Sequence, residues 1–457
     1  MSGNLKTEGK RSQTFVSFNQ AVFVWFKISL LSFGGPAGQI AVMHRLLVEE
    51  LKWVSEKRFL HALNFCMLLP GPEAQQLTIY LGWLLHRVRG GVVAGTLFVL
   101  PGALTVLVLS IIYVTYQQEM LVSSIFFGVK AAVLAIVTTA LWRLARKILR
   151  KKLLIGITIA AFLASFVFAV PFPIVIVGAA LATYFFGEAP VQTAVSDEEG
   201  EGRIIDSWVA AGGSPKPHKA FLVAAICAFL WLAPIAVLYG WLGAGHVYVQ
   251  EAMFFSKMAV VTFGGAYAVL SYMAQQTVGH YGWISAGEML DGLGMAETTP
   301  GPLIMVTQFV GFMGAYHNPG VLDPMMAGCL GALVTTWVTF APCFLWIFLG
   351  APYIELLRGN RVLAAALTGI TAAVVGVVLN LAIWFGLRVM FAELSDVALL
   401  GLDGIAVSLP VLSSFDPLAS AILAGALVAI AIFGVGMIKV LAVCAAAGLA
   451  LGSVGLV

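Results

Sequence analysis

The sequence has little charge. Only 10% of its 457 residues are charged, whereas 60% are hydrophobic. A soluble domain carries about 25% charged and about 45–50% apolar residues, so this chain cannot cover a surface that faces water. The composition therefore excludes a soluble enzyme, a disordered protein and a nucleic-acid-binding protein. A membrane-spanning helix needs about 20 apolar residues, which leaves room for about ten to thirteen helical segments.

The sequence also lacks the signatures of metal, disulfide and nucleotide sites. Its five cysteines lie in apolar runs without CxxC spacing, as small buried hydrophobic residues do. The histidines show neither HxxxH nor HxxE spacing, and no GxxxxGK[ST] motif is present. We therefore expect no metal, no cofactor and no enzymatic activity. Transport driven by membrane potential or by ion exchange is the remaining class of function.

Two polar segments divide the chain. Residues 1–14 carry three basic residues ahead of an apolar run that is far longer than the core of a signal peptide, so we expect a retained cytoplasmic tail. Residues 187–219 are acidic and rich in Gly, Pro and Ser, which is typical of a flexible linker, and we place this linker in the cytoplasm. It separates a first transport repeat, 15–186, from a second, 220–457.

These two units repeat at a fixed offset of 230 residues. The matching residues are Phe33-Gly34-Gly35 with Phe263-Gly264-Gly265, Pro70-Gly71-Pro72 with Pro300-Gly301-Pro302, Trp53 with Trp283, and Lys27 with Lys257. Chance identities between two apolar chains would fall on common residues rather than on Trp, Lys and a Pro-Gly-Pro triplet. We interpret the chain as a duplicated unit.

The basic residues predict how the first unit enters the membrane, because short cytoplasmic loops are rich in Lys and Arg. Basic loops follow both of the first two apolar segments, which is impossible for two simple spans with one cytoplasmic face. The conflict disappears if each segment is a broken or re-entrant hairpin that reverses at its Gly/Pro motif. Such hairpins are expected at 15–44, 59–86, 251–279 and 287–316.

The second unit shows the opposite charge pattern. Its matching loops contain no Lys or Arg, and the charge returns one loop later, at Arg358 and Arg361. This alternation predicts an all-α polytopic membrane protein whose two homologous halves are inverted relative to each other, as in many secondary transporters.

The four breaks predict an anion site near the middle of the membrane. Half-helix N-termini meet there in inverted-repeat transporters, and their positive dipole ends face the substrate. Free backbone N–H groups are expected at Gly34, Gly35, Gly71, Gly264, Gly265 and Gly301.

Lys27 and Lys257 each precede a Phe-Gly-Gly break by six residues. A lysine in hydrocarbon is costly unless it snorkels to a helix end or finds a partner. Snorkelling is one interpretation, and the duplication favours the other, in which one or both lysines balance the charge of a dianion. Lys130 has no counterpart in the repeat and is interpreted as structural.

Two carboxyl groups flank the Pro-Gly-Pro motifs. Glu73 follows the first motif and Glu297 precedes the second, and the two do not align at the repeat offset. Each is either the carrier of a coupling proton or a capping acid at a half-helix. Neutral hydrogen bonds to an oxyanion are offered by Asn64, Gln75, Gln76, Thr299, Thr307 and Gln308.

The runs SFGGPAGQIAVMH, LLPGPEAQQLTIYLGW, VVTFGG and ETTPGPLIMVTQF resemble those of the chromate ion transporter family, of the long, two-domain type. The resemblance covers nearly the whole chain. It implies a multi-pass transporter of the bacterial inner (plasma) membrane that exports chromate and confers chromate resistance, with sulfate as the competing analogue. It places the family motifs on Phe33, Gly34, Gly35, Pro36, Gly38, Gln39, Pro70, Gly71, Pro72, Glu73 and Gln76, and on Phe263, Gly264, Gly265, Thr299, Pro300, Gly301 and Pro302.

Composition and periodicity do not identify chromium. Chromate and sulfate are tetrahedral dianions of similar size, and a site of dipoles and lysines separates them poorly. A sulfate or general oxyanion permease and an anion channel stay open as alternatives, whereas the missing signatures disfavour a membrane enzyme. The expected partners are chromate, sulfate and the lipid bilayer. Gly91-x-x-x-Gly95 is a weak indication of a homodimer.

Overall fold

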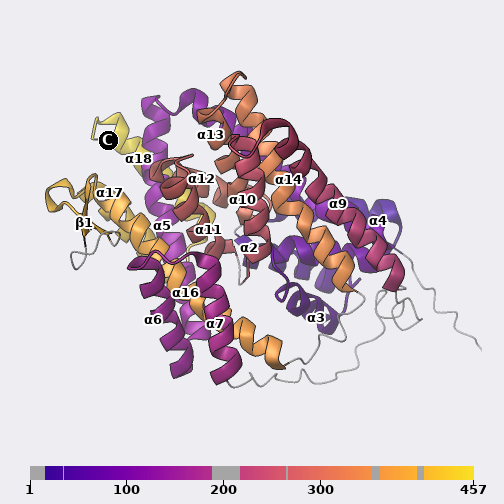
Figure 1. Ribbon diagram of the computed structural model, residues 1–457. Coiled ribbons are helices and arrows are strands. Elements are labelled where there is room, and N and C mark those ends of the chain that lie inside the picture. The colour runs from indigo at the N-terminus through magenta and orange to yellow at the C-terminus, as the bar shows by residue number, and fades with distance from the viewer. Residues whose placement is uncertain are drawn as a thin grey trace, which may run out of the picture.

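The computed structural model describes residues 16–33, 35–187, 217–263, 266–351, 361–398 and 406–456 (Figure 1). Most of the expected linker and the whole expected N-terminal tail lie outside these ranges. So do Gly34, Gly264 and Gly265.

Helices dominate both units. The first unit contains α1 (Phe18–Leu31), α2 (Gly35–His44), η1 (Arg45–Glu50), α3 (Glu56–Cys66), α4 (Glu73–Tyr116), α5 (Met120–Ile148), α6 (Lys152–Phe166) and α7 (Phe172–Phe186). The second contains α9 (Pro217–Leu242), α10 (Val247–Val261), α11 (Ala266–Ala274), η2 (Gln275–His280), α12 (Ala286–Thr298), η3 (Leu303–Met305), α13 (Val306–His317), α14 (Pro324–Gly350), α16 (Arg361–Met390), η5 (Leu412–Ser414), α17 (Pro417–Ala431) and α18 (Met437–Ser453).

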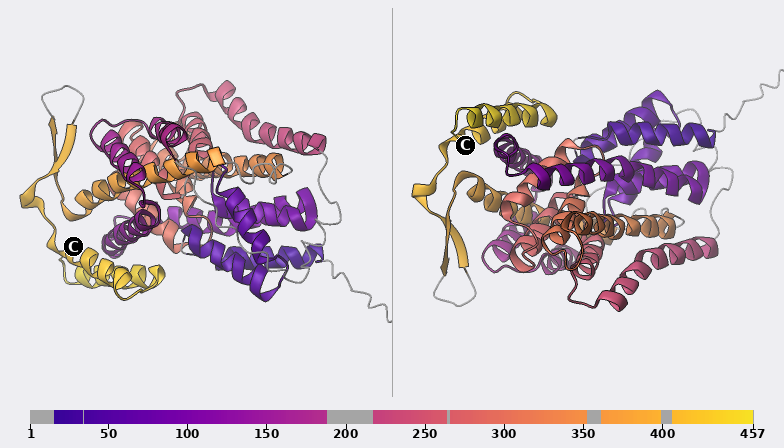
Figure 2. Two further views of the ribbon diagram at one scale, coloured as in Figure 1. Left: turned by 90° about the horizontal axis from the view of Figure 1, so that it is seen from below. Right: turned by 90° about the horizontal axis from the view of Figure 1, so that it is seen from above.

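The chain is an all-α polytopic membrane protein. Within the described residues, five helices are long and apolar enough to cross a membrane. These helices are α4, α5, α9 (from Ala220), α14 and α16 (from Ala364). The strands in the described part of the chain form one antiparallel hairpin, β1 (Leu394–Ala398) with β2 (Ala406–Pro410), in which Leu394 pairs with Pro410. This hairpin projects at one end of the elongated molecule, and α1 to α3 lie toward the other (Figure 2).

Each expected hairpin range has an α-helix on either side of its Gly/Pro motif, and the paired ranges fold alike in detail. The six-residue π-helical turns η1 and η2 begin 230 residues apart. Ser55 and Ser285, which also align, cap α3 and α12 by accepting hydrogen bonds from the backbone N–H groups of Arg58 and Glu288. One difference lies at the hairpin end: α4 runs on past 86, with a non-helical kink at His86 and Arg87, whereas α13 and α14 are joined by a loop.

Helices of each unit pack against helices of the other unit. α5 of the first unit packs against α17 and α18, and α16 of the second packs against α6 and α7. Small residues allow this close approach: a Cβ atom at Gly128 would overlap the carbonyl oxygen of Cys444. The Thr158 hydroxyl donates a hydrogen bond of 2.7 Å to the carbonyl oxygen of Ala372.

The GxxxG segment of α4 packs against other helices of the same chain. A Cβ atom at Gly91 would meet the ring of Phe348, and one at Gly95 would meet Ile79 and Phe344. These glycines therefore let α14 approach α4. The motif gives no support to a homodimer, because the face that it offers is already covered.

Candidate functional site

The breaks of the two units are joined to each other. The backbone N–H of Gly71 donates a hydrogen bond of 2.9 Å to the carbonyl oxygen of Thr262, and the N–H of Gly301 donates one of 2.9 Å to the carbonyl oxygen of Ser32. Ser32 and Thr262 directly precede the two Phe-Gly-Gly motifs. Each Pro-Gly-Pro loop is thus held by the other unit's Phe-Gly-Gly break, and the two contacts are equivalent under the repeat.

The Pro-Gly-Pro sequence explains why glycine makes this contact. Proline has no backbone N–H, so the central glycine carries the only backbone donor of the motif. Gly71 has a φ of 115° and Gly301 a φ of 99°, in the region that favours glycine. The motif therefore places one donor on a backbone that a residue with a side chain adopts only under strain.

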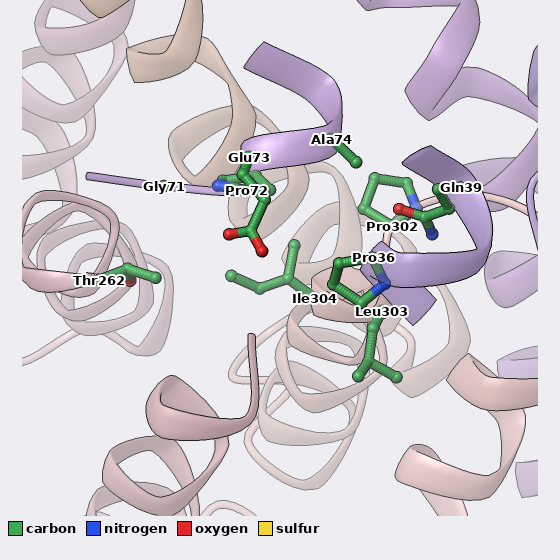
Figure 3. Close-up of a pocket in the computed structure, with 10 residues that line it drawn as sticks. All are labelled: Pro36, Gln39, Gly71, Pro72, Glu73, Ala74, Thr262, Pro302, Leu303 and Ile304. Carbon is green, nitrogen blue, oxygen red and sulfur yellow. The ribbon is translucent and has the colours of Figure 1, made fainter. Parts of the chain in front are cut away.

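A small cavity lies where these loops meet (Figure 3). It is lined by Pro36, Gln39, Gly71, Pro72, Glu73 and Ala74 from the first unit, and by Thr262, Pro302, Leu303 and Ile304 from the second. It has room for about one water molecule. A tetrahedral oxyanion is larger, so the loops must separate before such an ion can enter.

Glu73 is the acidic side chain of this lining. It is the first residue of α4, where the helix dipole is positive, and its side chain points toward the space between Thr262 and Ile304 (Figure 3). The preceding Pro72 offers no side-chain cap. Glu297 is buried near the end of α12 and does not line the cavity. The structure therefore separates the two carboxyl groups that the sequence treats alike.

Buried amides surround the loops. Gln39 donates from its Nε2 to the carbonyl oxygen of Gly301, and Gln76 donates from its Nε2 to the carbonyl oxygen of Pro70, at 2.6 Å. Neither side-chain oxygen has a hydrogen-bond partner among the described residues, and the amide of Gln75 has none for either atom. Gln39 crosses from one unit to the other, whereas Gln76 braces its own loop. Buried polar atoms of this kind are costly and mark sites where a ligand or water completes the bonding.

The expectation of free backbone N–H groups is wrong for Gly71 and Gly301 in this conformation. Both groups are committed to the contacts between the units. Gly35 begins α2 with a φ of 70°, and Pro36 after it lines the cavity. Thr299 is buried and donates to the carbonyl oxygen of Ala296 instead of lining the cavity.

Lys27 and Lys257 are not brought to the cavity. Both side chains are exposed on the outer faces of α1 and α10. In α1 the buried face is formed by residues such as Trp25 and Ile28, and the 3.6-residue period turns Lys27 away from it. The placement fits the snorkelling interpretation, because a lysine on the outer face can reach water along a helix.

Thr262 is a polar residue of the cavity lining that reasoning from the sequence missed. It aligns with Ser32 at the repeat offset, so two hydroxyl residues precede the two breaks. The hydroxyls of Ser32 and Thr262 donate to the carbonyl oxygens of Ile28 and Met258, four residues earlier, while their own backbone carbonyls accept from the glycines. This duplicated pair was the signal available in the sequence.

The chain is similar to known chromate transport proteins. The family model described as "Chromate transporter" matches residues 19–184 and 249–449. A "Chromate transport protein" of Pseudomonas aeruginosa is 32% identical over 368 residues, covering 79% of this chain and 80% of the relative. One of Cupriavidus metallidurans is 28% identical over 364 residues, covering 79% and 81%. No solved structure shows significant similarity to the chain. The chain belongs to the chromate transporter family.

Proposed function

We propose that the protein is a secondary transporter that exports chromate across the bacterial inner membrane and so confers chromate resistance. The name of the family and of the relatives supports the substrate. The observation that carries the mechanism is the pair of reciprocal contacts, Gly71 to Thr262 and Gly301 to Ser32, around a closed cavity. Alternating access exposes a site to one side of the membrane at a time, and in our proposal the two equivalent contacts open one at a time.

The proposed site consists of the helix breaks around this cavity. Opening one contact frees a glycine N–H, and the N-termini of α2 and α4 then supply positive dipole ends to a bound oxyanion. Gly34, Gly264 and Gly265 of the Phe-Gly-Gly motifs belong to the proposed set, together with Gly35, Pro36, Gln76 and Thr299. Lys27 and Lys257 are left outside the site because they are exposed.

The inverted arrangement of the halves is part of the proposal, and the long helices support it. Along α4, Gly91 lies against Phe348 at the end of α14. Tyr113, about 33 Å further along α4, donates a hydrogen bond to Asp291 in the middle of α12. Along α14, Gly331 lies against Gly311 of α13 and Gly350 against Phe65 of α3. The hairpin ends of the two units thus lie at opposite ends of both crossing helices.

Labelling from each side of the membrane tests the inversion. Glu50 and His280 are equivalent exposed residues at the ends of η1 and η2. In a cysteine-free background, a membrane-impermeant maleimide is expected to label Glu50→Cys only from the cytoplasmic side. His280→Cys is expected to react only from the outside. Labelling of both from one side would contradict the inverted arrangement.

Membrane potential favours outward movement of the anion. An inside-negative potential of 100 mV contributes about 4.6 kcal/mol to the exit of two negative charges. We expect saturable uptake of labelled chromate into inside-out vesicles with an interior-positive potential, only slightly reduced by excess sulfate. Uptake that sulfate abolishes would identify the alternative, a general oxyanion permease. Non-saturable flux at channel-like rates would identify an anion channel.

A further inference from the structure

A second polar cluster lies outside the cavity, between α12 and two long helices of the first unit. Asp291 of α12 is 4% exposed. Its Oδ2 accepts a hydrogen bond of 2.9 Å from the Tyr113 hydroxyl of α4 and lies 3.4 Å from Nζ of Lys130 on α5. Its Oδ1 has no hydrogen-bond partner among the described residues. Oδ2 of Asp291 therefore has two partners, whereas Oδ1 can still accept a proton.

The surroundings of the cluster are apolar. The Tyr113 ring makes edge contacts with Phe126 and Phe309, and Gly292, next to Asp291, lies against Phe309. A charge in such a place is expensive, and ionisable groups at membrane depth commonly mark ion or proton pathways. Packing alone would be served as well by apolar side chains of similar volume.

We propose that Asp291 binds a coupling proton of the transport cycle. This proposal rests on the proposed function, because it names the ion whose movement accompanies chromate. The proton adds to the open Oδ1 and converts the carboxylate into a neutral carboxylic acid. Lys130 keeps its own positive charge but loses the negative partner that holds α12 to α5. One proton is taken up, and no other bond changes.

The cluster suits a proton better than a metal cation. The Lys130 ammonium already occupies the position beside Oδ2 where a cation would balance the carboxylate. Hard cations also require several oxygen ligands, whereas a proton needs only one. In the described part of the chain, no three His, Cys, Asp or Glu side chains are grouped to hold a metal ion.

A path for the proton leads from the end of the hairpin. Glu288 lies one turn before Asp291 on α12, and its Oε1 is 3.5 Å from Nε2 of His317 at the end of α13. Together with Lys130 and Tyr113, these are the titratable groups that the described contacts place around Asp291. In the inverted arrangement this end of the hairpin faces the outside, so a proton would arrive from the side to which chromate leaves.

The same helix connects the cluster to the cavity. α12 continues from Asp291 to Thr298, and the Pro-Gly-Pro loop that follows donates from Gly301 to Ser32. A change in how α12 is held to α5 therefore acts on the contact that closes the cavity. Loading of Asp291 from outside would couple inward proton movement to outward chromate movement, and the membrane potential favours both.

Purified full-length protein in liposomes tests the assignment. Chromate flux is measured with labelled ion, and proton flux with an enclosed pH-sensitive dye. Asp291→Asn keeps an acceptor for Tyr113 but cannot take up a proton, so we expect proton flux per chromate to fall at least about tenfold. Chromate–chromate exchange is expected to persist. Glu56→Gln removes an exposed carboxylate that pairs with His44, away from both the cavity and this path, so it is the control and should keep the native ratio.

The outcomes separate the two proposals. No chromate movement in the native protein would overturn the proposed function, whereas native chromate movement without protons would overturn only the role of Asp291. An unchanged proton-to-chromate ratio in Asp291→Asn would also overturn it. If that variant does not fold, Tyr113→Phe and Lys130→Gln are used instead. Both should shift the pH at which ΔpH-driven uptake is half-maximal, and an unshifted profile in both would overturn the proposal.

Discussion

A chain carrying Gly301→Val is expected to insert into the membrane in normal amounts and to transport chromate at about 1% of the native rate or less. Gly301 has a φ of 99°, and a Cβ atom there would lie 3.3 Å from the Cα of Gly102. Valine at this angle costs about 1–3 kcal/mol in the closed state, and its branched side chain also presses α4 away from the loop. The loop would therefore lose the geometry that directs its only N–H toward Ser32.

A control variant must show that transport is lost because of where the strained valine lies, and not because the backbone is strained at all. Gly320 also has a positive φ, of 60°, but lies in the loop before α14 with open space around the added atom. Gly320→Val should therefore lower stability without a comparable loss of transport. Initial rates of labelled chromate uptake, normalised to protein detected in the membrane, measure both variants. Near-native transport by Gly301→Val would show that the loop contact is not part of the cycle.

The first-unit loop gives an independent check of the same idea. Gly71 has a φ of 115°, and its added Cβ would meet Nε2 of Gln76 at 3.0 Å and Sγ of Cys343 at 3.2 Å. These neighbours are side-chain atoms, which can move more easily than the backbone beside Gly301. Gly71→Val is therefore expected to reduce transport strongly, but less completely than Gly301→Val.

The positions of the hairpins could be predicted because the repeat carries rare residues. Trp, Pro-Gly-Pro and the capping serines recur at one offset, and each has a local structural consequence: a turn, a helix start or a break. Those consequences need only neighbouring residues. Helices consequently begin and end close to the expected ranges, including α2, which ends at His44, and α13, which ends at His317.

Contacts between the units could not be predicted in the same way. Which carbonyl accepts from Gly71 or Gly301 depends on how the two units dock, and the local sequence does not encode this. The placement of Lys27 and Lys257 could not be predicted for the same reason. Their duplication is visible in the sequence, but whether they face the cavity or the outside depends on which face of α1 and α10 is buried. Both helices are apolar on nearly all sides, so the helical period gives little guidance.

Asp291 illustrates what a search for duplicated residues overlooks. Its counterpart at the repeat offset is His61, and Lys130 has no counterpart that the repeat identifies. The pair is formed by α12 and α5, which belong to different units, so neither residue is informative alone. A signal did exist, since an acidic residue inside a membrane hairpin is itself a reason to expect function.

The Glu73→Gln variant is expected to bind chromate at pH 8 at least about tenfold more tightly than the native protein, because a carboxylate 4 Å from one unit charge contributes roughly 4 kcal/mol of repulsion at an effective dielectric constant of 20. Glu73 lines the cavity, and its side chain points into the region where the oxyanion would sit (Figure 3). A dianion doubles this repulsion. We therefore expect the native protein to bind chromate well only when Glu73 is protonated, since the acid can then also donate a hydrogen bond to the anion.

The sign of the pH dependence follows from this repulsion. In the native protein the apparent KM for chromate should rise as pH rises, because the carboxylate form becomes more populated. In Glu73→Gln it should change only through the acid–base chemistry of chromate itself, which affects both proteins equally. Glu297→Gln is the matched control, since Glu297 does not line the cavity. A steep native profile that persists in Glu73→Gln would show that the proton which matters for chromate binding is held elsewhere, and would remove Glu73 from the proposed site.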